Sequence, residues 1–170
     1  MTPFLTRVQL AVFLSALLHA GSAAAQSTPR DIFVGWAPAF VDPEYRILPA
    51  WALSVAGGGR VAPVFDVGGW YFCCDQSIHN LLGGVRFRPA DSDGPRPFAQ
   101  VLAGTSIFHA YGTAGGWAFV PGGGVDVPIP GHALAIRVQG DYVGVYAPGD
   151  YGRYYCDHVW RISTGVVFPF

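Results

Sequence analysis

The chain has 170 residues, a formal net charge of −1 and only 12% charged residues, whereas ordinary soluble domains carry about 25%. This length suits one domain. The near-neutral balance, without a basic stripe, excludes nucleic acid as an expected partner. Apolar residues make up 51% of the chain, which together with the low charge favours a protein that meets a membrane.

Residues 1–25 have the pattern of an export signal. Arg7 supplies the positive charge, residues 10–18 are almost purely apolar, and Ala23, Ala24 and Ala25 form a small-residue cleavage site. The apolar stretch is too short for a transmembrane helix, which needs about 20 residues. We therefore expect cleavage before Gln26. The mature domain, residues 26–170, is then either secreted and soluble or crosses a membrane as strands.

The mature chain repeats segments of roughly ten residues in which apolar and polar side chains alternate, as strands of a transmembrane barrel do. Each segment closes at Gly, Pro, Asp or Asn. Eight strands are expected, in chain order 31–40, 51–56 or somewhat longer, 60–72, 78–88, 97–108, 116–127, 133–146 and 159–170.

The expected connectors alternate in length. Residues 57–59 and 128–132 are short turns, and the longer connectors 42–48, 73–77 and 147–158 lie at the opposite end. With the N-terminus in the periplasm, the longer loops fall outside, as barrels prefer. Residues 89–96 are long for an inside turn, and 73–77 are short for an outside loop.

Alternation gives each strand one apolar and one polar face, most clearly at Ile136 and Val138 against Arg137 and Gln139. A soluble sandwich would alternate in the same way. The charges, however, share their face with Gly, Ala and Ser, which suits a narrow lumen better than a solvated surface. The expected fold is all-β, an eight-stranded antiparallel transmembrane up-and-down β-barrel.

Eight polar side chains are expected to face the lumen. Charges in a narrow, low-dielectric space must pair or be heavily hydrated. Arg137 and Asp141 lie about 13 Å apart along one strand, so each needs a partner on another strand. The expected network comprises Asp66, Arg86, Arg88, Asp126, Arg137, Gln139, Asp141 and Arg161.

This network has two interpretations. It is a polar plug, because eight strands enclose a space that side chains just fill, or it is a gate whose broken pairs open a water path. The plug is favoured. The gate stays open because small inward residues leave room for water: Gly35, Ala37, Ala39, Ala52, Ser54 and Ala56.

The C-terminal motif is Ser163-x-Gly165-x-x-Phe168-x-Phe170. A polar residue, a glycine and two apolar residues ending in an aromatic are typical of the assembly signal of outer-membrane barrels. The assembly machinery pairs with the edge of such a strand. The expected partners are therefore this machinery and the lipid of the outer membrane.

Three segments carry a family resemblance: GGGVDV at 122–127, LAIRVQGDY at 134–142 and RISTGVVF at 161–168. They resemble the last three strands of the outer-membrane β-barrel domain family, related to the OmpA-like transmembrane barrel. Weaker similarity reaches back through 64–69 and 97–99. The resemblance implies the barrel fold and an outer-membrane location, but no specific function. Pro169 departs from the pattern, at a strand terminus where proline is tolerated.

Aromatic residues near strand ends suit the interfacial belts of a membrane barrel. The alternative interpretation is that these aromatic rings form a platform that binds sugars. Tyr151, Tyr154 and Tyr155 stand apart in the last outside loop, where they pack over the barrel mouth or contact a surface ligand. The expected outer belt comprises Phe40, Trp51, Trp70, Tyr71, Trp117, Tyr146 and Trp160, and the inner belt Phe87, Phe168 and Phe170.

Three cysteines predict one disulfide and one free thiol in an exported protein. We expect Cys156 to bond with Cys73 or Cys74. These residues and His158 also match a zinc site by type, but adjacent cysteines are poorly spaced for a metal, so no metal is expected.

Enzymatic chemistry has little support in the sequence. A barrel lipase or deacylase needs a Ser-His-acid set. His79, His109, His132 and His158 lie near strand ends without a nucleophile motif. The expected function is therefore a small non-enzymatic barrel, without cofactor, that contributes to envelope structure or surface interaction. A narrow gated channel for small ions or solutes is the alternative, and a lipid-modifying enzyme is a weaker one.

Overall fold

The computed structural model describes residues 30–41, 46–72, 76–89, 94–109, 113–148 and 154–170. The signal segment, Cys73, Cys74 and Tyr151 lie outside these ranges. None of the described residues belongs to a helix long and apolar enough to span a membrane. The described strands are β1 Asp31–Trp36, β2 Ala39–Val41, β3 Arg46–Leu48, β4 Ala50–Ala56, β5 Val61–Tyr71, β6 Ser77–Phe87, β7 Arg96–His109, β8 Thr113–Pro128, β9 Ala135–Pro148 and β10 Tyr154–Pro169.

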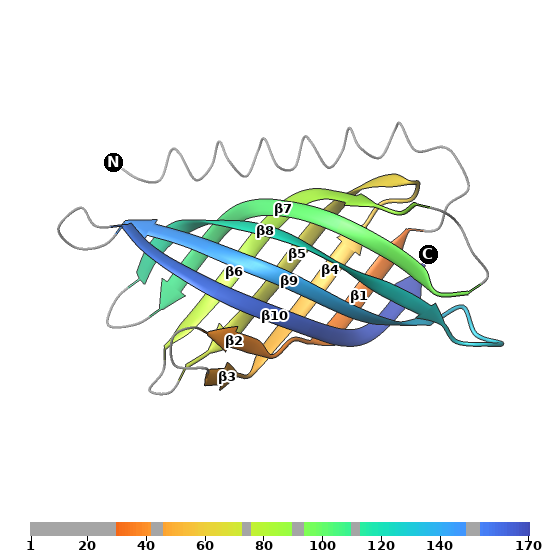
Figure 1. Cartoon of the computed structure of the whole chain (residues 1–170), viewed down its shortest axis with the longest axis horizontal. Helices are drawn as coiled ribbons and strands as arrows, with labels where there is room; N and C mark the ends of the chain where they lie inside the picture. Colours follow the sequence, from red (N-terminus) through yellow and green to blue (C-terminus); the bar gives the residue numbers. More distant parts are fainter. Residues whose placement is uncertain (1–29, 42–45, 73–75, 90–93, 110–112, 149–153) are drawn as a thin grey trace.

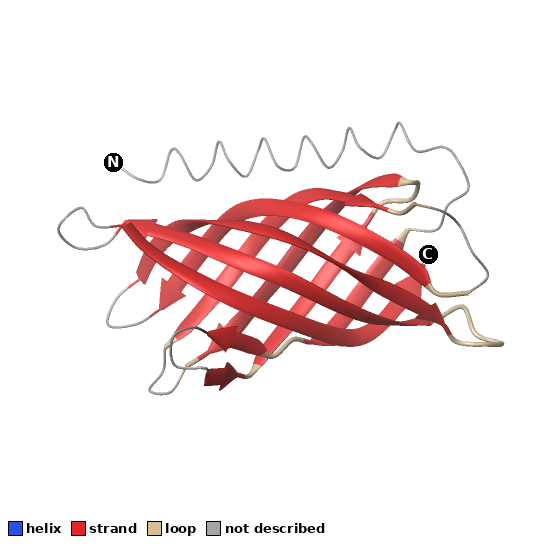
Figure 2. Ribbon diagram, in the orientation of Figure 1, coloured by secondary structure: helices blue, strands red, loops and turns tan. Residues whose placement is uncertain are grey.

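The strands form one closed antiparallel barrel (Figures 1 and 2). Neighbours follow chain order from β4 to β10, and β1 closes the sheet by pairing with both β4 and β10. β2 continues β1, because Trp36 pairs with Thr164 and Ala39 pairs with Arg161 in the same register. β3 continues β4 in the same way. The ten segments are thus eight barrel strands, and the expected fold is confirmed.

A proline lies at each of the two interruptions. Pro38 lies between β1 and β2, and Pro49 lies between β3 and β4; neither has an N–H to donate to the ladder. Their carbonyl groups still accept, from Ile162 N and Tyr71 N, each at 3.1 Å. The ladder loses donors at these points but keeps its register.

Some expected boundaries were wrong. Residues 42–48 and 147–158 were expected to be connectors, yet β3 occupies the end of the first range and β9 and β10 extend into the second. Cys156, for example, pairs with Tyr146. Backbone pairing between neighbouring strands continues past the residues that signalled a turn.

The barrel has two distinct ends. The end that we call the turn end carries the connectors 57–60 and 129–134, where Gly59 and Gly131 have positive φ angles of 102° and 77°, a conformation that favours glycine. Arg30 and Phe170 also meet there through backbone hydrogen bonds of 2.9 and 3.2 Å. The opposite end, where β2 meets β3 and β5 meets β6, is the loop end.

Trp70 corrects the expected outer belt. Its side chain is only 1% exposed and belongs to the buried core, whereas Tyr71 is 46% exposed on the outer face. Successive residues of a strand point to opposite faces, so Trp70 shares the lumen side with Asp66. Trp36, 60% exposed, adds an aromatic ring to the outer face that the sequence analysis omitted.

Candidate functional site

The polar side chains of the lumen form two groups. The turn-end group comprises Asp31, Arg86, Arg88, Asp126 and Arg137. Arg137 donates to both carboxylate oxygens of Asp126, from Nε at 2.6 Å and Nη2 at 2.8 Å. Its Nη2 also lies 3.2 Å from Asp31 Oδ1. Asp31 accepts further bonds from Arg86 Nη1 at 3.3 Å and from Arg88. Asp31 thus lies at the centre of this group, with three guanidinium groups around one carboxylate.

The mid-barrel group comprises Asp66, Gln139, Asp141 and Arg161. Arg161 reaches two strands at once: Nη1 lies 3.1 Å from Asp66 Oδ1, and Nη2 lies 2.9 Å from Asp141 Oδ2. Gln139 Nε2 donates to the same Asp141 oxygen at 2.8 Å. All four side chains are almost fully buried.

Gln100 joins the two groups. Its Oε1 accepts from Arg86 Nε and Nη2, at 3.1 and 2.8 Å, and its Nε2 donates to Asp141 Oδ1 at 3.2 Å. The turn-end group has three Arg against two Asp, and the mid-barrel group has one Arg against two Asp. A neutral amide therefore connects a half with one excess positive charge to a half with one excess negative charge. The whole network is balanced, as burial of charges requires.

Small and aromatic neighbours make room for these charges. A Cβ at Gly68 would lie 3.0 Å from Arg161 Nη1, and a Cβ at Gly122 would collide with the Asp141 carboxylate. The ring of Phe98 lies 4.4 and 4.8 Å from the guanidinium carbons of Arg86 and Arg137. Stacking on an aromatic face stabilises a cation, and here one ring contacts two guanidinium groups.

An apolar layer fills the lumen on the loop side of the network. Leu102 follows Gln100 on β7, and Val143 follows Asp141 on β9, in the direction of the loop end. These side chains are not exposed to solvent. The apolar layer comprises Trp70, Leu82, Leu102, Val120, Val143 and Val145.

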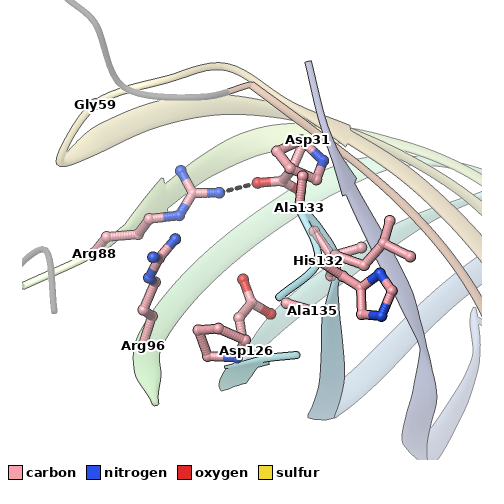
Figure 3. A pocket seen from close by; sticks show the side chains of 12 residues that line it. Asp31, Gly59, Arg88, Arg96, Asp126, His132, Ala133 and Ala135 are labelled. Atoms are coloured by element: carbon pink, nitrogen blue, oxygen red, sulfur yellow. Dashed lines mark hydrogen bonds and ion pairs between the residues drawn. The ribbon is translucent and has the colours of Figure 1, made fainter. Parts of the chain in front are cut away.

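A cavity of about 320 Å³ opens at the turn end (Figure 3). Arg88 and Arg96 lie on one side of it, and His132 with the 133–135 segment lies on the other. Asp31 and Asp126 also line it. Three members of the turn-end group, Asp31, Arg88 and Asp126, thus face this mouth, whereas Arg86 and Arg137 are fully buried behind them.

The structure places all eight predicted lumen residues on the lumen side. Arg88 is the most peripheral, with 15% of its side chain exposed. Asp31 and Gln100 were not among the predicted lumen residues. Asp31 starts its strand on the same face as Phe33, and this alternation was the available signal. Of the small inward residues, Ala37, Ala39, Ala52 and Ala56 belong to the buried core, and the ring of Phe33 covers Gly35.

Other predicted residues fall into two sets. Ser163 faces the lumen, whereas Phe168 and Phe170 are 44% and 61% exposed on the outer face. Cys73 and Cys74 lie outside the described residues, and the side chains of Tyr154, Tyr155, Cys156 and His158 are likewise not described. The disulfide stays a prediction. Among the described residues no group of three metal-ligating side chains occurs.

Solved structures share this architecture. Neisserial surface protein A aligns with a TM-score of 0.60 and 11% identity over 85% of this chain and 98% of its own. The N-terminal barrel domain of OprF from Pseudomonas aeruginosa gives 0.56 and 15%, over 84% and 98%. Ail, the attachment invasion locus protein of Yersinia pestis, gives 0.53 and 12%, over 84% and 100%. The fold is that of the OmpA-like outer-membrane barrels. A scan of protein-family models and a search of curated proteins found no match.

Proposed function

We propose that the chain is a small non-enzymatic barrel that spans the outer membrane and contributes to envelope structure or surface interaction. One observation carries the proposal: the ion pairs lie inside, while large apolar side chains cover the outer wall. Val61, Val85 and Val101 are 65%, 53% and 45% exposed. A soluble domain would lose stability by exposing such a wall to water, whereas lipid tails stabilise it.

Strand length supports the same proposal. A tilted transmembrane strand needs about 9–11 residues. β5 and β6 have 11 residues each, and β7 and β9 have 14. Every one of these strands is long enough to cross the hydrocarbon core.

Two arginine substitutions test the membrane position. Val101→Arg places a charge on the outer wall in the middle of β7 and should cost about 2–4 kcal/mol of stability in lipid vesicles, whereas Ile47→Arg near the loop end should cost about 0–1 kcal/mol. Urea titration, read by heat-modifiable gel migration, measures both. Equal effects of the two variants would mean that the outer wall does not face lipid.

We also propose that the last strand carries the signal for assembly. Phe168→Asp should lower assembly in cells more than Phe87→Asp, a matched change on the outer face of β6. Refolding into pure lipid vesicles should be impaired equally in both, because both lose the same kind of lipid contact. Equal loss in cells would reject the recognition role.

A gated channel is the second candidate, and the turn-end cavity is the observation in its favour. Asp31 and Arg88 line this cavity and pair with each other, so an exchange of partners there would admit water. The apolar layer argues against a permanent pore. Single-channel recording decides: we expect no conductance from the parent protein, and steady conductance would favour the channel. Unchanged lipid A mass after expression would argue against the enzyme alternative.

A further inference from the structure

Four rings gather on the outer face near the loop end, away from the lumen network. Trp51, Tyr71, His79 and His109 come from β4, β5, β6 and β7, four successive strands of the sheet. His79 lies at the centre, with ring centroids 6.3 Å from Trp51, 5.7 Å from Tyr71 and 6.1 Å from His109. We call these residues the histidine cluster.

A glycine provides the place for the central ring. A Cβ at Gly69 would lie 2.5 Å from Nδ1 of His79, so only glycine leaves room for the imidazole over the neighbouring strand. The ring is thereby held against the barrel wall between Trp51 and Tyr71. A side chain held in this way has lost most of its freedom before any ligand arrives, which lowers the entropic cost of binding.

The depth of the cluster follows from the residues around it. On the outer face of β6, Ser77 and His79 precede Leu81, Val85 and Phe87 toward the turn end. The change from polar to apolar side chains marks the boundary between headgroups and hydrocarbon. On the other side of the barrel, the described outer-face side chains near the loop end include the rings of Trp117, Tyr146 and Trp160.

We propose that the histidine cluster binds the phosphate group of a lipid headgroup, in the leaflet at the loop end. An imidazole donates at least one N–H in either protonation state, and the Tyr hydroxyl and Trp indole donate as well. Imidazole, hydroxyl and indole donors gathered around His79 suit the several acceptor oxygens of a phosphate. The inference rests on the proposed membrane-spanning function.

The surroundings indicate lipid as the source of the phosphate. Leu81 and Ile107, 40% and 39% exposed, lie beside the cluster on its hydrocarbon side. An acyl chain covers these side chains while its headgroup reaches the donors. Free phosphate would contact only the donors, on an outer wall open to competing water.

Binding is tested on the folded full-length protein with phosphatidic acid, which carries an exposed phosphate monoester, and phosphatidylcholine as the reference lipid. Native mass spectrometry counts the lipid retained. The parent should prefer phosphatidic acid, and the double variant His79→Phe/His109→Phe should bind it at least about a hundredfold more weakly, because two hydrogen bonds to a charged group are lost. Phenylalanine keeps the rings of the belt. His132→Phe, at the turn end, should keep the preference.

The outcomes separate the inference from the function on which it rests. Equal retention of phosphatidic acid by the parent and the double variant would overturn the site. Inorganic phosphate that displaces phosphatidic acid at comparable concentration would overturn the lipid as its source. A parent protein that does not insert into vesicles would refute the membrane-spanning function itself. Heat-modifiable migration verifies that each variant is folded.

Discussion

The lumen has two halves that are filled by different kinds of side chain, charged ones toward the turn end and mostly apolar ones toward the loop end. Toward the turn end, four Arg and four Asp side chains balance one another in one connected network, and small residues such as Gly68 and Gly122 make room for them. Toward the loop end, Leu102, Val120 and Val143 fill most of the space, and Ser106 donates a hydrogen bond to Asn80. The stability of the apolar half depends on how well its side chains fill the space. The stability of the charged half depends on every charge having a partner, because each missing partner leaves a buried charge. Mutations should therefore act differently in the two halves.

The largest effect is expected from Arg137→Ala. This change removes the bidentate partner of Asp126 and one of the three guanidinium groups around Asp31. Breaking a buried pair costs about 3–5 kcal/mol. Thermal unfolding in vesicles should show a lower Tm, and reconstituted bilayers should leak more ions. Arg30→Ala, outside the barrel, should change neither. A variant that melts and conducts like the parent would show that the network does not hold the lumen closed.

Leu102→Ala tests the apolar half. The leucine is fully buried, and truncation to alanine in a packed core costs about 2–5 kcal/mol, depending on how far the site collapses. We place this variant near 3 kcal/mol by the same scale, measured by urea titration. Leu102→Met, which nearly keeps the volume, should recover most of the loss. If Leu102→Met is as unstable as Leu102→Ala, side-chain volume does not account for the stability of this half.

Gln100→Leu disconnects the turn-end group from the mid-barrel group without removing a charge. Arg86 and Asp141 each lose a hydrogen-bond partner, so the cost should be about 1–3 kcal/mol. Combination with Arg137→Ala should be non-additive, because both changes act on one connected network. Additive free energies of unfolding in a double-mutant cycle would mean that the amide does not couple the two groups.

The smallest effect is expected from Phe98→Leu. Its ring contacts the guanidinium groups of both Arg86 and Arg137, and such stacking contributes about 0.5–2 kcal/mol. Phe108→Leu is the control, because that ring packs against the apolar core instead. The difference between the two variants in free energy of unfolding measures the stacking. No difference would assign to Phe98 a space-filling role only.

Sequence periodicity predicted the two faces of the strands better than their ends. Alternation placed Arg137, Asp141 and Arg161 on the lumen side because one face of each strand is apolar. It could not show that β9 and β10 continue beyond Tyr146 and Val159, because this depends on pairing between neighbouring strands. Trp70 was wrongly assigned to the outer belt, because its aromatic side chain was given more weight than its position in the alternation.

The network itself was only partly predictable. Counting charges gave four Arg against three Asp, and the fourth carboxylate, Asp31, was omitted because it begins the first strand. Its partners are Arg86 and Arg137, which lie 55 and 106 residues away in the chain. No local pattern connects residues at such separations. Gln100 was missed for a related reason, since an amide becomes a bridge only when both of its partners are in place.

The position of Asp31 on the strand that closes the sheet has a kinetic consequence. β1 pairs with β10, so its carboxylate reaches Arg86, Arg88 and Arg137 only when the first and last strands have met. Contacts between residues so distant in sequence form slowly, because a long loop must close first. An intermediate with an open seam therefore holds three arginines short of a counter-ion, and closure of the seam and neutralisation of the lumen become a single cooperative step.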